Sequence, residues 1–177
     1  LDSVQRLFAA GRPSAGLADT LVRQGISYVV LRNDLDPETS RSARPLLVHR
    51  AIDGSPGLVK VAEFGEKVGP GTVEGFISDS GLRPLFPAIE IYRVQPVGAD
   101  TATGSPGAPY LTDANAMVRV AGGPESLLRI DERRRLADRP PMGPMLLTAD
   151  AQRAGLGTPP GRGVIVTDTP VDRETDY

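Results

Sequence analysis

The sequence predicts an α/β protein with a mostly parallel, Rossmann-like sheet flanked by helices and with one antiparallel or edge strand. Residues 28–31 form an uninterrupted run of aromatic and aliphatic side chains, as in strands buried on both faces of a parallel sheet. Residues 117–166 alternate short apolar runs with helical patterns, which is the rhythm of βαβ units. Residues 89–94 alternate from one side chain to the next, as a half-exposed antiparallel or edge strand does.

The first 95 residues are predicted to form one α/β lobe. Apolar stripes and glycine or Gly-Pro stops predict helices at 2–10, 15–24 and 43–52. Runs of β-forming residues predict strands at 26–31, 58–64 and 89–94. Residues 65–87 are rich in Gly and Pro and are expected to form a long loop.

A linker or surface loop at 96–115 is predicted from its Pro, Gly, Ala, Thr and Ser content. The second lobe, 116–177, follows it with a βαβαβ pattern. Its strands are expected at 117–120, 144–147 and 164–166, and its helices at 124–136 and 150–154. We expect both lobes to share one sheet.

Composition excludes several classes of function. The net charge of −2 gives no electrostatic footprint for nucleic acid, so no nucleic-acid partner is expected. The absence of cysteine excludes disulfides and thiol nucleophiles, and a single histidine excludes a histidine-cluster metal site. No apolar run approaches the ~20 residues of a membrane span. The chain begins at Leu1 rather than Met and ends at Tyr177 just after an apparent strand and turn, so we expect it to be a fragment of a longer polypeptide.

Polar residues at the ends of two predicted strands are the candidate substrate-binding residues. Ligands of open α/β sheets gather beyond the carboxyl ends of strands. The residues in that position are Arg32, Asn33, Asp34, Asp36 and Asp168. Two aspartates can ligate a hard cation or act as an acid and base, but the stretch 36–39 is also a helix N-cap with Pro at the first turn. Because capping and turn chemistry explains these acids, no catalytic residue and no metal site are predicted.

Three other features have an ordinary structural interpretation. Gly122-Gly123 before a helix resembles a phosphate-binding turn, yet it lacks the remaining glycine of a dinucleotide fingerprint and the Lys-Ser/Thr of a P-loop. His49 is interpreted as a surface histidine or a satisfied core histidine. The run 133–135 is interpreted as a solvated helix face, with anion binding as the alternative.

Five segments together resemble one known family. They are 28–36 (YVVLRNDLD), 56–65 (PGLVKVAEFG), 122–128 (GGPESLL), 166–170 (VTDTP) and 173–177 (RETDY). In consistent order over nearly the whole chain, they are similar to the actinobacterial α-(1→3)-arabinofuranosyltransferase family. The resemblance implies a glycosyltransferase of cell-wall biogenesis, a multi-pass membrane enzyme of the GT-C type that uses decaprenyl-phosphate arabinofuranose to branch the arabinan of arabinogalactan and lipoarabinomannan.

The resemblance implies a place for this chain but no catalytic residue in it. The family's catalytic acid lies in a membrane-proximal loop of the multi-spanning region, and this chain contains no membrane span. It is therefore expected to be a soluble, extracytoplasmic (periplasmic) α/β scaffold subdomain, not an enzyme alone and without a cofactor. Its expected partners are the catalytic membrane core and the carbohydrate-binding-like modules of the same polypeptide.

Two alternative functions stay open. The chain can be a glycan-binding module for the arabinan acceptor, with Tyr28, Tyr92 or Tyr110 stacking on sugar and the aspartates at 34 and 36 binding hydroxyls. Its aromatic content of 5% argues against this. It can also be a stand-alone nucleotide-binding, Rossmann-like enzyme, which the incomplete glycine pattern disfavours.

Overall fold

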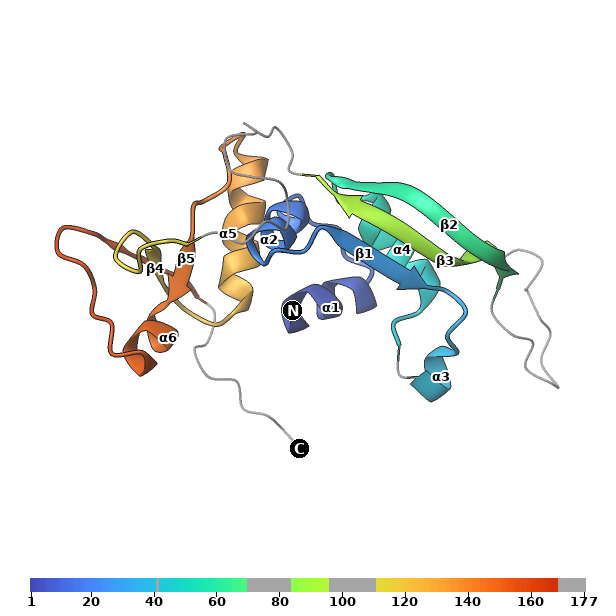
Figure 1. The fold of residues 1–177 in the computed structure, drawn as a ribbon, viewed down its shortest axis with the longest axis horizontal. Helices are drawn as coiled ribbons and strands as arrows, with labels where there is room; N and C mark the ends of the chain where they lie inside the picture. Colours follow the sequence, from blue (N-terminus) through green and yellow to red (C-terminus); the bar gives the residue numbers. More distant parts are fainter. Residues whose placement is uncertain (41, 70–83, 96–110, 169–177) are drawn as a thin grey trace.

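The computed structural model describes residues 1–40, 42–69, 84–95 and 111–168, which form two lobes that meet at a pair of helices (Figure 1). The first lobe contains α1 (Asp2–Ala9), α2 (Leu17–Arg23), β1 (Tyr28–Arg32), α3 (Pro37–Ser40), α4 (Pro45–Asp53), β2 (Leu58–Val68) and β3 (Phe86–Val94). The second lobe contains β4 (Val118–Ala121), α5 (Glu125–Leu136), β5 (Met145–Leu147), α6 (Thr148–Arg153) and β6 (Val164–Val166).

Sheet A of the first lobe has the strand order β1-β3-β2 and is antiparallel throughout. The prediction of a mostly parallel sheet is therefore wrong for this lobe. The helix α4 does connect β1 to β2, and these two strands run in the same direction, but β3 returns between them. As a result β1 is an edge strand, and Tyr28 and Val30 are 56% and 58% exposed rather than buried.

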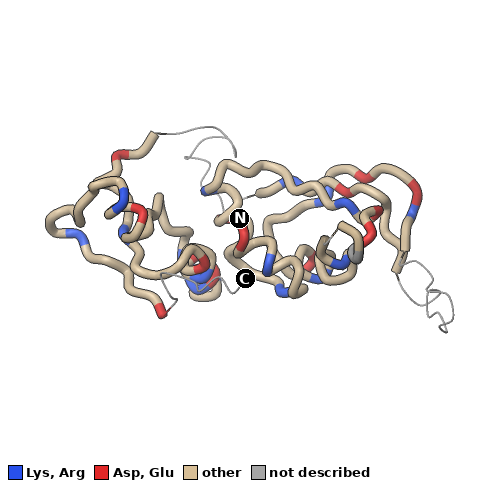
Figure 2. The backbone as a smooth tube through the Cα atoms, turned by 90° about the horizontal axis from the view of Figure 1, so that it is seen from below, with Lys and Arg blue, Asp and Glu red and all other residues tan. Residues whose placement is uncertain are grey.

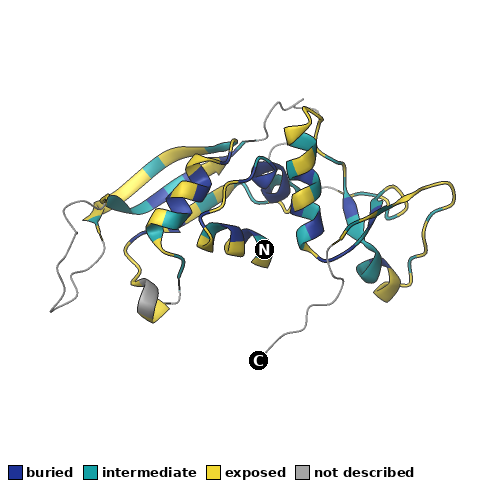
Figure 3. Ribbon diagram, turned by 180° about the vertical axis from the view of Figure 1, so that it is seen from behind, coloured by how far each residue is buried: buried dark blue, intermediate teal, exposed yellow. Residues whose placement is uncertain are grey.

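One face of sheet A carries the core of the lobe. Val48 and Ile52 of α4 pack against Leu31 and Tyr92 of the sheet, and a second cluster joins α1, α2 and β3. The view from behind shows α4 lying in front of the sheet, with buried and exposed residues alternating along it (Figure 3). The opposite face of sheet A has no helix on it in the described part of the chain.

The hairpin of β2 and β3 is longer than predicted. Strand β2 continues to Val68, so the expected loop at 65–87 begins later, and most of it lies outside the described residues. The β2–β3 register has two irregularities, between Lys60 and Ala62 and between Phe64 and Lys67. One lies at Gly65, where φ is 80° and a Cβ would lie 2.7 Å from the Ala88 Cβ, so that only glycine fits without strain.

Sheet B of the second lobe confirms the parallel βαβαβ pattern. Its order is β5-β4-β6, and both pairings are parallel. Among the described residues the two sheets are separate, so the lobes do not share one sheet there, and a Rossmann-like fold is not confirmed. The division at 95 and 115 stays a prediction, and most of the expected linker lies outside the described residues.

The lobes are joined by buried charge pairs between α2 and α5. Asp131 is 0% exposed and accepts two hydrogen bonds of 2.6 Å from the Arg23 guanidinium and one of 3.0 Å from the Thr20 hydroxyl. Arg135 makes a second bidentate pair with Asp19, at 2.5 and 2.6 Å. The prediction of a solvated face at 133–135 is wrong for Arg135, because its guanidinium reaches across to an acid of the other lobe.

Close backbone approach accompanies these pairs. A Cβ at Gly16 would lie 2.3 Å from the backbone nitrogen of Glu132 and 2.7 Å from the carbonyl carbon of Asp131. The N-terminal end of α2 therefore contacts α5 directly. Ion pairs and packing together fix the two lobes to each other.

Charge and hydropathy complete the description. Basic and acidic residues are interspersed over both lobes (Figure 2). None of the helices in the described ranges combines the length and the apolar content needed to cross a membrane.

Candidate functional site

Arg32 and Asp34, at the end of β1, neutralise each other. The Arg32 Nε and Nη2 atoms donate to the two Asp34 carboxylate oxygens, each at 2.7 Å. The hydrogen bonds from Arg32 hold the pKa of the Asp34 carboxyl below its usual range, and the same pair raises the pKa of Arg32. Both groups lie at the surface, where such a pair stabilises the fold little.

Asp36 organises the turn into α3. Its side chain accepts a hydrogen bond of 2.9 Å from the Thr39 hydroxyl, and its backbone carbonyl accepts one of 3.0 Å from the Ser40 amide. These contacts are those of a turn into a short helix, and the helix N-cap interpretation stays a prediction.

Asp168 lies in the other lobe, after β6 of sheet B. Its side chain is 78% exposed and lies 3.7 Å from the Arg129 guanidinium. It follows a different sheet from the residues after β1, so the candidate residues divide between the lobes. Their substrate-binding role stays a prediction.

Asn33 differs from its neighbours because it turns inward. It is buried, and its Nδ2 donates to the Pro87 carbonyl at 2.7 Å and to the Glu90 carboxylate at 3.0 Å. The structure thus connects one predicted residue to an acid that the sequence analysis did not single out.

Glu90 is the centre of a buried polar cluster under sheet A. It is 2% exposed and accepts a hydrogen bond of 3.1 Å from the Lys60 Nζ in addition to that from Asn33. The His49 Nε2 lies 2.9 Å from the same carboxylate, at ion-pair distance but without the alignment of a hydrogen bond. His49 is also stacked on Phe86, with ring centroids 3.7 Å apart. The interpretation of His49 as a core residue fits this position.

Burial and charge set the protonation of the cluster. Burial lowers the pKa of His49, although the negative charge of Glu90 opposes this, so the imidazole is neutral at pH 7. Hydrogen bonds from Lys60 to Glu63 and Glu90 raise the pKa of the lysine. Burial, followed by the charge of Glu90, raises the pKa of Tyr92 to about 12.

The cluster forms one wall of a cavity of about 650 Å³ between α4 and the β2–β3 hairpin. Both lysines of the chain line this cavity, as do Asp53, Glu63 and the rings of Phe86 and Tyr92. With His49 neutral, three carboxylates face two ammonium groups. This balance disfavours an anionic ligand and suits a neutral, hydroxylated one, for which the carboxylates accept and the lysines donate hydrogen bonds.

Only a weak sequence signal points to Glu90. It lies in a strand whose side chains alternate between two faces, with Ile89 and Ile91 on one face and the residues at 90, 92 and 94 on the other. The structure buries the second set. A signal was present in Tyr92 and Val94, which lie on the same face of the strand as Glu90 and are apolar enough to face a core.

Among the described residues, no cluster of three or more histidines and acids is arranged to hold a metal ion.

The turn at Gly122-Gly123 begins a helix, as its structural interpretation predicts. The helix α5 starts at Glu125, and the Ser126 amide donates to the Gly123 carbonyl at 3.0 Å. An acid in the first turn complements the helix dipole.

Comparison with known proteins gives one consistent result. The model of the family described as alpha-(1->3)-arabinofuranosyltransferase, N-terminal GT-C domain, matches residues 1–177. The chain is 72% identical to an alpha-(1->3)-arabinofuranosyltransferase of Mycolicibacterium smegmatis and 68% identical to one of Mycobacterium tuberculosis, in each case over 100% of the chain and 12% of the relative. It is also similar to the cryo-EM structure of arabinofuranosyltransferase AftD from mycobacteria, with a TM-score of 0.79 and 65% identity over 99% of this chain and 13% of that one. The chain therefore spans about an eighth of the length of these relatives.

Proposed function

Because the chain belongs to the α-(1→3)-arabinofuranosyltransferase family and matches its N-terminal GT-C domain, we propose that it is a non-catalytic scaffold subdomain of such an enzyme. In this role it lies on the extracytoplasmic side of the membrane and supports the membrane-embedded catalytic part of the same polypeptide. The parent enzyme would transfer arabinofuranose from a lipid-linked donor to cell-wall arabinan.

The buried connection between α2 and α5 carries this proposal. A scaffold must keep its parts in fixed positions, and here two bidentate arginine–aspartate pairs link the lobes through residues more than 100 positions apart in sequence. Bidentate pairs add geometric specificity to their energy. The acids at 34 and 36, which are the best acid–base candidates from the sequence, are engaged in a surface pair with Arg32 and in a hydrogen bond from the Thr39 hydroxyl.

An activity assay tests the proposal. The purified 177-residue chain is incubated with decaprenyl-phosphate arabinofuranose and an arabinan oligosaccharide, and transferred arabinose is measured. The scaffold role predicts no transfer above that of a chain-free blank, whereas the intact polypeptide transfers under the same conditions. Turnover by the chain alone would refute the proposal.

A second function, binding of the arabinan acceptor, is favoured by the cavity at Glu90. Its volume of about 650 Å³ is within the ~300–1,000 Å³ range of ligand sites. The Tyr92 side chain is only 5% exposed and the Phe86 ring is stacked on His49, so the carboxylates and ammonium groups that line the cavity would make the main contacts with the hydroxyls of a sugar.

Titration with arabinan oligosaccharides, followed by NMR, separates the possible binding places. Acceptor binding at the cavity predicts shifted amide resonances at Lys60, Lys67 and Tyr92 at millimolar ligand, and these shifts weaken in Lys67→Ala. Shifts near Asp34 instead would favour the edge predicted from the sequence. An unchanged spectrum would exclude acceptor binding by this chain and leave the scaffold role intact.

A further inference from the structure

The face of sheet A opposite α4 is apolar and exposed. The register places Tyr28 and Val30 of β1 beside Arg93 and Ile91 of β3. On the other side of β3, the register places Val59 of β2 beside Arg93 and Phe64 of β2 beside Ile89. We call this surface the open face; its apolar members are Tyr28, Val30, Val59, Phe64, Ile89 and Ile91.

The exposure of the open face is not that of scattered surface residues. Tyr28, Val30, Val59 and Phe64 are each between 42% and 58% exposed, and they belong to one three-stranded surface. The helices α1 and α4 lie on the opposite side of the sheet (Figures 1 and 3). Contiguous apolar surface of this kind marks an interaction site.

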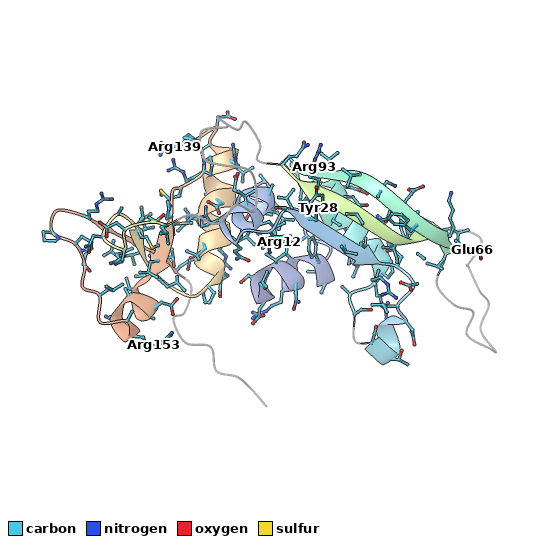
Figure 4. The ribbon with its side chains drawn as sticks, viewed as in Figure 1. Arg12, Tyr28, Glu66, Arg93, Arg139 and Arg153 are labelled. Carbon is cyan, nitrogen blue, oxygen red and sulfur yellow. The ribbon has the colours of Figure 1, made fainter. Side chains whose placement is uncertain are left out.

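Two arginines lie on the same side of sheet A as the open face: Arg32, which is paired with Asp34, and Arg93. Arg93 is the cross-strand partner of Tyr28, and the two residues lie next to each other in Figure 4. An arginine beside an aromatic ring is typical of the anchoring residues of protein interfaces. The Arg93 guanidinium already contacts the side-chain amide of Gln95, so we expect the matching surface to be mainly apolar, with at most one further acceptor near Arg93.

The length of the relatives indicates where that surface comes from. The chain covers 12% of each relative, so about seven-eighths of such a polypeptide lies outside it. A covalently attached surface has an effective concentration in the millimolar range, far above that of a second copy. An anionic lipid surface is disfavoured because the chain has a net charge of −2.

We propose that the open face is the docking surface through which this chain packs against another part of the same polypeptide. The inference rests on the proposed scaffold role and adds the surface by which support is transmitted. Burial of a flat apolar sheet face gives a wide contact, and Arg93 fixes its orientation.

The absence of cysteine in the chain allows a direct test. Val30→Cys and Phe64→Cys are introduced separately into the intact, membrane-embedded polypeptide, with Leu136→Cys as the control. Leu136 is also a large exposed apolar residue, 74% exposed, but it lies at the end of α5 and away from sheet A. Reaction with a membrane-impermeant maleimide is followed by mass spectrometry of the labelled peptide.

Docking predicts that the thiols at 30 and 64 react about 10-fold more slowly than the thiol at 136, since labelling requires an accessible thiolate. Equal rates at all three positions would overturn the proposal. Protection that disappears on dilution would instead identify a second copy, and protection that disappears on exchange of lipid for detergent would identify the bilayer; both outcomes also overturn it. The activity assay of the isolated chain is independent of these rates, so the docking surface and the scaffold role can fail separately.

Discussion

Replacing Asp131 by Asn should lower the free energy of unfolding of the chain by about 3 kcal/mol. Removing one partner of a buried ion pair costs about 3–5 kcal/mol, because the other charge is left uncompensated. The Asp131 side chain is fully buried, whereas that of Arg23 is 13% exposed and can be partly hydrated after the substitution. We therefore expect the lower end of the range.

Urea denaturation followed by circular dichroism measures this loss, and a thermal scan should show a fall in Tm of about 6–12 °C at about 2–4 °C per kcal/mol. The matched control is Glu132→Gln, which removes the neighbouring pair with Arg12, whose arginine side chain is 61% exposed. It should cost no more than about 1 kcal/mol. The double variant Arg23→Met/Asp131→Leu replaces the pair by apolar groups and should recover most of the loss.

A loss below about 1 kcal/mol for Asp131→Asn, equal to that of the control, would refute the reasoning. It would mean that the pairs between the lobes are not what holds them together.

Three further predictions follow from the same structure. Gly16→Ala should destabilise the chain by about 1–3 kcal/mol in urea denaturation, because the added Cβ would meet the α5 backbone. The control Gly143→Ala, whose Cβ would have nothing within 4 Å, should change stability by less than about 0.5 kcal/mol. Equal effects of the two substitutions would argue against close contact between α2 and α5. The pKa of His49 is lowered in the folded state, whereas in the unfolded state this histidine titrates near its ordinary pKa of about 6.5. As the pH drops through about 6.5, the unfolded state therefore binds more protons than the folded state, and the free energy of unfolding should fall. His49→Gln should flatten this dependence of stability on pH. An unchanged slope in His49→Gln would show that another group titrates. Tyr92 should ionise with a pKa of about 12, and the highest phenolate transition in an ultraviolet titration should disappear in Tyr92→Phe; its persistence would assign that transition to another tyrosine.

The second lobe could be predicted from sequence because its signals are local. Strands β4 and β5 of sheet B are each followed by a helix, and parallel pairing follows from that alternation. Sheet A could not be predicted in the same way. The apolar run at 28–31 suits a buried parallel strand and an edge strand with one open face equally well. Its partner, β3, is more than 50 residues away, and nothing local indicates that it returns between β1 and β2.

The candidate site shows the same limit. Asp36 contacts Thr39 and Ser40, which lie within four positions of it in sequence, so a local turn could be anticipated there. Glu90 depends on donors from Asn33, His49 and Lys60, which approach it only in the fold. The buried role of Asp131 depends likewise on an arginine 108 residues away, so a charged helix was predicted as a solvated one.

The central claim, that this chain contributes structure and not a reacting group, is tested most directly by kinetics of the intact polypeptide. Asp34→Asn, Asp36→Asn and Asp168→Asn remove the predicted polar candidates one at a time, and kcat is measured per folded molecule. The scaffold role predicts values within about 2-fold of the unsubstituted enzyme, because a general acid or base contributes about 10²–10⁴-fold. A loss of about 100-fold in kcat with an unchanged Tm would contradict it.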